Sequence, residues 1–182
     1  MICTLCNTLC GTVNSPILPE GPKDATVLII LDELSSQQDF AGSYYSGKHG
    51  RLLTEIIESS GLSRENCVVI SVAGCRGKGI SPYLTRLLAD RRFRTICTLG
   101  DESLRVVCKK TGVREKRGGT YPIHKTWGIS GNVRVGATYG LGDILNNPNY
   151  KKVVIQDIRT YTETGSDEEV LEWRYWDETT EK

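Results

Sequence analysis

Clustered cysteines near the start of the sequence are the first residues whose type and spacing could do chemistry. Cys3, Cys6 and Cys10 stand together, and the whole chain carries seven cysteines. The opening residues lack the basic region and the long apolar region of a secretory signal, so we expect a cytoplasmic protein. Disulfides would be reduced in that compartment, so these cysteines indicate a metal site rather than cross-links.

A second candidate is the segment "GSYYSGKHG" at residues 42–50, which fits the phosphate-binding pattern G-x-x-x-x-G-K-[ST] up to its last position. His49 stands where that pattern requires a hydroxyl group for magnesium. A phosphate-binding loop also leaves a strand directly and opens a helix, whereas the strand expected before this segment ends near Leu31. We therefore reject a nucleotide-binding loop.

The third candidate is a pair of carboxylates, Asp32 and Glu33, directly after an apolar run. In open α/β sheets, ligands gather at the carboxyl ends of the strands, where this pair would lie. For an acidic pair without further context, a solvated turn that closes the strand is the alternative.

The elements that must position these groups alternate along the chain. Apolar runs bounded by turn residues predict short buried strands, and apolar residues at helical spacing predict helices between them. We place strands at 25–31, 66–74, 93–100 and 132–139, and helices at 49–61, 81–92, 101–112, 141–147 and 151–158. Ser81 and Asp101 are the expected N-caps of the second and third helices. This alternation favours a three-layer α/β/α sandwich around a short, mostly parallel sheet.

Charge divides the chain unevenly. The net charge is +1, but residues 161–182 contain eight acidic and two basic side chains, so this extension carries −6 and residues 1–160 carry +7. We expect one domain over 1–160 followed by an acidic extension, in which "EEVLEWRYWDE" could add an edge strand. A basic body suits a nucleic-acid-binding protein, and an unevenly charged soluble protein is the alternative. The basic segment 109–121 is expected to be a solvated loop that could contact phosphate.

Several motifs in sequence order resemble the uracil-DNA glycosylase superfamily, most closely its iron–sulfur-containing family 4 branch. The resemblance runs from Cys3 to about Asp157 and starts with "CTLC", which is similar to the first cluster cysteines. The segment "VLIILDELSSQQDFAGSYYSGKHGRLL" is similar to the family's first motif, and "VVISVAGCR", "RTICTLGDES", "KRGGTY" and "GATYGLGDILNNP" resemble later ones. The resemblance implies a glycosylase-like fold, binding to DNA, and cleavage of an N-glycosidic bond after the base has been flipped out.

The same resemblance implies roles for individual residues. Tyr45 falls on the aromatic residue that stacks on the extruded base, although a half-buried core aromatic is the alternative. The neighbouring Tyr44 and His49 would also border the base, while a surface histidine is the alternative for His49. Asp32 or Glu33 would stabilise the sugar cation and orient water, and of the two we choose Asp32.

The resemblance also implies which residues contact DNA. Leu141, between two glycines, would be the wedge that fills the gap left by the base, and a packed loop leucine is the alternative. The basic residues expected at the phosphates are Lys48, Arg76 and Arg117.

Two departures from the family pattern fall on the base-binding positions. Ser71 stands where the family has its uracil-selecting asparagine, and Gly140 stands at the motif histidine. Smaller side chains at both walls of a pocket would admit a bulkier base, such as a hydroxymethylated or sugar-bearing phage pyrimidine. We therefore expect excision of a modified base, with antiviral defence or phage DNA metabolism as the role. A catalytically inactive DNA-binding descendant and a conventional uracil repair enzyme are the alternatives.

The resemblance also bears on the metal. Cys75 falls on the family's third cluster ligand, whereas Ser81 stands where the fourth is expected, so Cys10 is the nearest replacement. Four thiolates suit a [4Fe–4S] cluster or structural zinc, and the resemblance favours the cluster. Cys67, Cys97 and Cys108 lie in strand or helix patterns and are expected to be buried core residues. We expect a monomer that binds DNA and no membrane.

Overall fold

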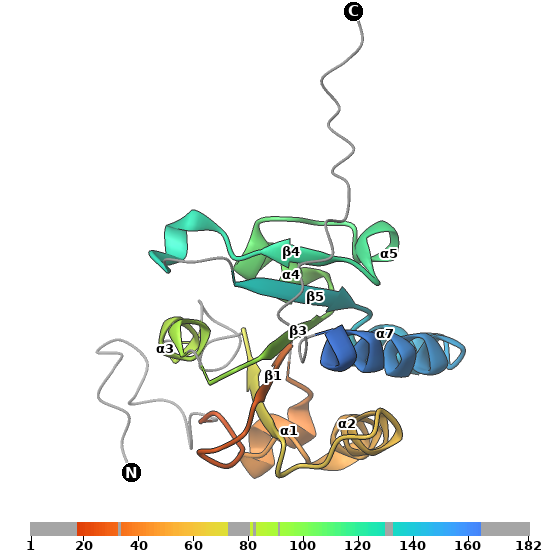
Figure 1. Ribbon diagram of the computed structural model, residues 1–182. Coiled ribbons are helices and arrows are strands. Elements are labelled where there is room, and N and C mark those ends of the chain that lie inside the picture. The colour runs from red at the N-terminus through yellow and green to blue at the C-terminus, as the bar shows by residue number, and fades with distance from the viewer. Residues whose placement is uncertain are drawn as a thin grey trace, which may run out of the picture.

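A five-stranded sheet lies at the centre of the computed structural model, which describes residues 18–32, 34–72, 81, 83–90, 92–129 and 133–164. The strands are β1 (Val27–Leu31), β2 (Cys67–Ser71), β3 (Thr95–Leu99), β4 (Thr120–Pro122) and β5 (Arg134–Thr138). The helices are α1 (Ser36–Ala41), α2 (Gly47–Ser59), α3 (Leu84–Ala89), α4 (Asp101–Cys108), α5 (Val113–Lys116), η2 (Lys125–Trp127), α6 (Leu141–Asn146) and α7 (Tyr150–Thr164). Figure 1 shows the twisted sheet with helices on both of its faces.

The strand order in the sheet is β2-β1-β3-β5-β4. All neighbouring pairs are parallel except β4 with β5, which is antiparallel. The register aligns Leu31 with Ser71 on one side and with Leu99 on the other, and Leu99 in turn with Thr138. The carboxyl ends of four strands therefore meet at one end of the sheet. The predicted mostly parallel α/β fold is confirmed.

Alternation of side chains along the buried strands builds two cores. In β1, β2 and β3, odd-numbered positions such as Ile29 and Val69 pack with α2, α6 and α7, whereas even-numbered positions such as Ile30 and Ile70 pack with α3 and α4. Apolar residues on both faces explain why the strands are continuous hydrophobic runs, as expected for a sheet covered on both sides.

Both edges of the sheet are short or covered. Next to β2, Glu20 forms an antiparallel bridge in which its N–H donates to the Val69 carbonyl and its carbonyl accepts from the Val69 N–H. At the other edge, β4 has three residues and ends on Pro122, which has no N–H to donate. Among the described residues, no helix is long and apolar enough to cross a membrane.

Several local expectations are corrected. Tyr83, not Ser81, is the N-cap of α3, and Gly100, not Asp101, is the N-cap of α4. The Asp101 carboxylate instead accepts hydrogen bonds from the backbone N–H groups that begin α5. The segment 109–121 is not a simple loop, because it contains α5 and the start of β4.

The predicted domain boundary at residue 160 lies inside α7. That helix continues to Thr164, and Tyr161 packs in the core, with its hydroxyl donating to the Ala137 carbonyl at 2.7 Å. The predicted edge strand in the acidic extension lies outside the described residues.

A buried carboxylate joins α7 to the sheet and to the turn before β4. Asp157 accepts from the Thr138 hydroxyl at 2.7 Å and from the Arg117 guanidinium at 3.1 and 3.2 Å. The Asp157 side chain is 6% exposed and that of Arg117 is 35% exposed. Three elements far apart in the sequence thus share one acceptor.

We expect Asp157→Ala to lower the free energy of unfolding by about 2–4 kcal/mol, because it leaves a buried hydroxyl and a half-buried guanidinium without their acceptor. Denaturant unfolding measures this change. The control is Lys151→Gln, which breaks the more exposed pair with Glu55 and should cost less than about 1 kcal/mol. Equal losses in the two variants would contradict a structural role for Asp157.

Candidate active site

The carboxylate of Asp32 is held at the carboxyl end of β1, the second strand of the sheet, by the start of α4. Its Oδ1 accepts from the Ser103 backbone N–H at 2.6 Å, and its Oδ2 accepts from the Glu102 N–H at 3.2 Å. These N–H groups belong to the first turn of α4, which no side chain of its own N-cap satisfies. A residue on β1 therefore caps a helix that begins after β3, and the cap fixes the direction of the carboxylate.

Gly100 makes this approach possible. Its φ of 117° is in the region that favours glycine, and a Cβ at this position would lie 2.0 Å from Oδ2 of Asp32. Any side chain at residue 100 would therefore displace the carboxylate from the helix. Gly100 also donates its N–H to the Thr138 carbonyl at 2.9 Å, which fixes it against the end of β5.

Burial raises the pKa of the Asp32 carboxyl above its ordinary value of 3.8. The hydrogen bonds from Ser103 and Glu102 act in the opposite direction, and the negative charge of Asp143 adds to the increase. Burial is the largest of these effects, because partial loss of water disfavours the charged form of a carboxyl group.

Asp32 also lies at a point where the chain changes face. Helix α2, which follows β1, packs in the core on one face of the sheet. Helix α4, which follows the neighbouring strand β3, packs in the core on the other face. Such a divergence of loops is where open α/β sheets bind their ligands. The candidate site is therefore the end of the sheet between β1 and β3.

Ser71, at the end of β2, borders Asp32 through the backbone. Its hydroxyl donates to the Asp32 carbonyl at 2.7 Å, and its backbone N–H donates to the Tyr44 hydroxyl at 3.1 Å. Tyr44 is 1% exposed and belongs to the core on the α2 side. The side chain of Tyr44 is thus packed in the core with its hydroxyl bonded to β2, and its position beside a base stays a prediction.

Gly140 approaches the same end of the sheet from β5. A Cβ here would lie 3.2 Å from the Gly100 Cα and 3.4 Å from Oδ2 of Asp143. The Gly140 N–H donates to that Asp143 oxygen at 2.9 Å. Ser71 and Gly140 thus both lie near Asp32, but Ser71 contacts the Tyr44 hydroxyl and Gly140 packs against the Gly100 backbone.

The Tyr45 side chain packs against Arg64 and the core on the α2 side. The guanidinium of Arg64 lies 4.0 Å from the centre of its ring, and burial raises the pKa of its hydroxyl to about 12. The Tyr45 hydroxyl is buried and has no hydrogen-bond partner among the described residues. A half-buried aromatic packed against the core describes Tyr45 in this structure, and its stacking on a base stays a prediction.

His49 lies in the first turn of α2 and is partly exposed. Burial, and then the positive charge of Lys48, lower the pKa of its imidazole below the ordinary value of 6.5. The side chain of Lys48 is exposed. Neither residue is linked to Asp32 by a described contact, so their roles at a base and at a phosphate stay predictions.

Leu141 is not an exposed wedge. It is the first residue of α6, is 6% exposed, and packs in the core on the α2 side. The side chain of Leu141 is packed in this structure, as the alternative expects, and its role as a wedge stays a prediction. The Arg117 guanidinium forms an ion pair with Asp157. Its expected contact with a DNA phosphate stays a prediction.

Several predicted residues lie outside the described part of the chain. They are Glu33, Arg76 and the four predicted metal ligands Cys3, Cys6, Cys10 and Cys75. Within the described part, no group of three or more histidine, cysteine or acidic side chains could hold a metal.

The three described cysteines, Cys67, Cys97 and Cys108, are buried and free, as predicted. Burial raises the pKa of the Cys67 and Cys108 thiols to about 12, which disfavours the thiolate that a metal needs.

Two contributors were not identified from the sequence. Asp143 supplies a second negative charge near Asp32, and its position in the first turn of α6 is the signal that could have identified it. Tyr139 and Tyr150 stack with ring centres 4.1 Å apart, which joins the end of β5 to the start of α7. Only the fold brings the two tyrosines together.

Comparison with known proteins identifies relatives of the chain. No family model matches it, but curated proteins named type-4 uracil-DNA glycosylase do. The protein of Saccharolobus solfataricus is 32% identical over 81% of this chain and 74% of its own length, and that of Sulfurisphaera tokodaii is 27% identical over 79% and 72%. The protein of Archaeoglobus fulgidus is 25% identical over 87% of this chain and 86% of its own length.

With these relatives, the fold and the carboxylate at its switch point define a DNA glycosylase, a hydrolase of the N-glycosidic bond. The chain belongs to the type-4 uracil-DNA glycosylase family.

The raised pKa of Asp32 predicts that the free energy of unfolding depends on pH. Because the folded protein binds this proton more tightly than the unfolded chain, the contribution to stability is complete below pH 3.8 and is lost as the pH rises through the higher folded value. Wild-type protein should therefore lose free energy of unfolding relative to Asp32→Asn as the pH is raised from 3.8 towards neutrality. Denaturant unfolding at a series of pH values measures the difference. A relative gain of wild-type stability over this range would show that the α4 amides outweigh burial.

Proposed function

We propose that this protein excises a base from DNA by hydrolysing its N-glycosidic bond, with Asp32 as the residue that stabilises the reacting sugar. Cleavage of this bond builds positive charge on the sugar, and a nearby carboxylate lowers the energy of that charge and orients the attacking water. The observation that carries the proposal is the Asp32 carboxylate, held by two α4 amides at the switch point of the sheet. Glu33 is the second carboxylate of the proposal, and the reaction would take place in the cytoplasm.

The amides of α4 have a defined part in this chemistry. They favour the ionised carboxylate, which is the form that stabilises a cation, while burial favours the protonated form. A desolvated anion interacts more strongly with a developing positive charge than a fully hydrated one. The balance of these two effects would give an active anion at neutral pH.

The substrate we propose is a modified pyrimidine, with a phage-type hydroxymethylated or sugar-bearing base as the leading example. The support is chemical: Ser71 and Gly140 offer neither an amide nor an imidazole to the edge of uracil. Packing of Tyr44 against Ser71 and of Gly100 against Gly140 limits the space gained by these replacements.

Two other functions have specific support. The names of the relatives favour uracil as the base that is removed. Burial of Leu141, with Tyr44 packed beside Ser71, favours a DNA-binding protein that has lost excision.

We also propose that Cys3, Cys6, Cys10 and Cys75 hold a [4Fe–4S] cluster. A bound cluster would supply a cross-link between the chain start and the segment after β2, with no role in the excision step. Support comes from the cysteine spacing and from the burial of the other three cysteines. Iron and sulfide analysis tests the proposal, and colourless protein with stoichiometric zinc would overturn it.

The decisive experiment compares duplexes that contain unmodified, uracil-containing, hydroxymethylated and glucosylated bases. Alkali-labile breaks report abasic sites, and we expect them on one of the modified duplexes. Breaks confined to the uracil duplex would instead identify a conventional repair enzyme. Binding without breaks on any duplex would identify an inactive protein.

On the duplex that is cut, Asp32→Asn should lower the excision rate by about 100-fold or more, because it removes the charge but keeps the side-chain shape. The matched control is Asp143→Asn, which removes a like charge that raises the pKa of Asp32. That variant should stay active and shift the acidic limb of the pH–rate profile to lower pH. Full activity of Asp32→Asn would transfer the role to another residue.

A further inference from the structure

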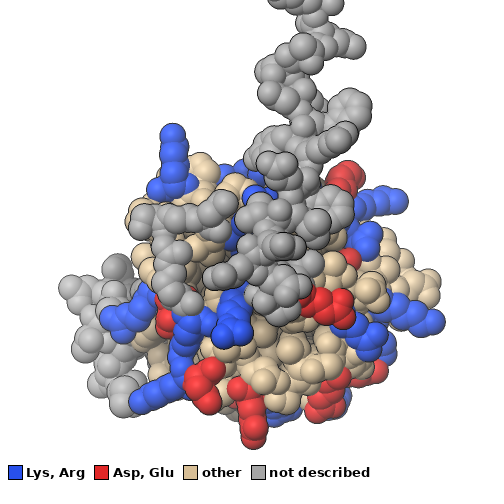
Figure 2. All heavy atoms as spheres, viewed as in Figure 1, with Lys and Arg blue, Asp and Glu red and all other residues tan. Residues whose placement is uncertain are grey.

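A group of basic residues lies at the β4 edge of the sheet, three strand spacings from the strand that ends at Asp32. Residues 109–134 contain seven lysines and arginines and one acidic residue, Glu115, so this segment carries +6 in a chain whose net charge is +1. Figure 2 shows basic side chains on the β4 side, in the upper part of the view, and others further down at the left and right, whereas acidic side chains lie mainly in the lower half.

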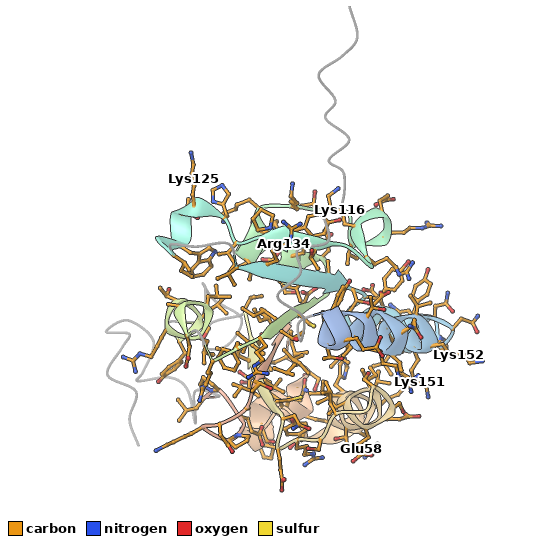
Figure 3. The ribbon with its side chains drawn as sticks, in the orientation of Figure 1. Glu58, Lys116, Lys125, Arg134, Lys151 and Lys152 are labelled. Carbon is orange, nitrogen blue, oxygen red and sulfur yellow. The ribbon has the colours of Figure 1, made fainter. Side chains whose placement is uncertain are left out.

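Four side chains define what we call the β4 edge surface: Lys110, Lys116, Lys125 and Arg134. Figure 3 shows three of them, Lys116, Arg134 and Lys125, along the β4 side of the ribbon. The Lys110 ammonium lies 5.7 Å from the centre of the Tyr121 ring, on β4 itself. The surface therefore lies along β4, with its cations on the segments that flank β4 and on the neighbouring strand β5.

The charges of these four side chains are not neutralised by ion pairs among the described residues. In the described part of the chain, none of the four lies within ion-pair distance of a carboxylate. Arg134 is held flat by two hydrogen bonds, from its Nε to the Thr120 hydroxyl and from its Nη2 to the Thr120 carbonyl. The remaining N–H groups of its guanidinium are left for a ligand.

The strand register places one end of this surface at the end of the sheet that holds Asp32. Because β4 is antiparallel to β5, Thr120 pairs with Gly136 and Pro122 with Arg134, and Gly118 donates to the Ala137 carbonyl. The Lys116 end thus lies at the end of the sheet that holds Asp32, and the surface runs towards the opposite end. Three strand spacings separate β4 from β1, or about 14 Å, which is the length of about four base pairs of duplex.

We propose that the β4 edge surface binds the phosphate backbone of duplex DNA beside the nucleotide that is being processed. Charged residues on an edge strand also prevent pairing with other chains, but charges of either sign would serve that purpose. A mainly basic surface that begins at the same end of the sheet as the proposed active site fits a polyanion instead. This inference rests on the proposed action on DNA and adds a contact surface outside the catalytic residues.

The test measures binding to a short duplex that contains no modified base, by fluorescence anisotropy over a series of salt concentrations. The triple variant Lys116→Gln, Lys125→Gln, Arg134→Gln should bind about tenfold more weakly, and its salt dependence should decrease by about one unit of slope per lost contact. The matched control is Lys23→Gln, Arg86→Gln, Arg94→Gln, which removes the same charge from exposed sites elsewhere. We expect its affinity to stay within about twofold of wild type.

The proposal would be overturned if the edge triple variant kept the affinity of wild type and its salt dependence. An equal loss of affinity in the control variant would also overturn it. Arg134→Lys keeps the charge, and it should bind as wild type; weakening in this variant alone would show that Arg134 acts through the fold of the edge. On a duplex that is cut, the edge triple variant should raise KM and leave kcat unchanged. Because the binding assay needs no excision, failure of the proposed function and failure of this surface give different results.

Discussion

The hydrogen bonds from the first turn of α4 to the Asp32 carboxylate are the interaction on which the site depends. They tie the end of β1 to the helix after β3, so they hold together two loops that leave the sheet towards opposite faces. The same bonds keep the carboxylate at the open end of the sheet rather than in bulk solvent. Position and direction of the proposed reacting group therefore have one structural cause, whereas its pKa reflects burial opposed by these bonds.

Glycine at two strand ends is the complement of that interaction. Gly100 leaves room for the carboxylate. A Cβ on Gly140 would lie 3.2 Å from the Gly100 Cα, so glycine at residue 140 allows the turn after β5 to pack closely against Gly100. The replacement of a larger residue at position 140 is then linked to close packing of two turns. A small residue at position 140 can serve this close packing or a wider base pocket. Excision of a bulky base would favour the wider pocket, and excision of uracil alone would favour the packing.

The strands and long helices could be predicted from the sequence because their apolar runs and helical spacing are local signals. The short elements could not: α5 and β4 have few residues, and the charges of 109–121 hide them. The capping of α4 by Asp32 was also out of reach, since 70 residues separate Asp32 from Glu102. Local rules selected Asp101, which is adjacent in sequence but caps α5 instead.

The neighbouring tyrosines show a second limit of pattern reasoning. Alignment of motifs selected Tyr45 for a base, yet Tyr44 is the one whose hydroxyl bonds to Ser71. Two adjacent residues of the same type differ in direction only through the turn between α1 and α2, which no short-range signal specifies.

The two margins of the sheet have a consequence for the behaviour of the protein in concentrated solution. A strand from another molecule would meet the Glu20 bridge at one margin, and at the other a three-residue strand that ends on Pro122. Neither offers a long row of free backbone donors and acceptors as a template. Sheet-to-sheet polymerisation is therefore disfavoured by the backbone itself, whatever the salt concentration does to the surrounding charges.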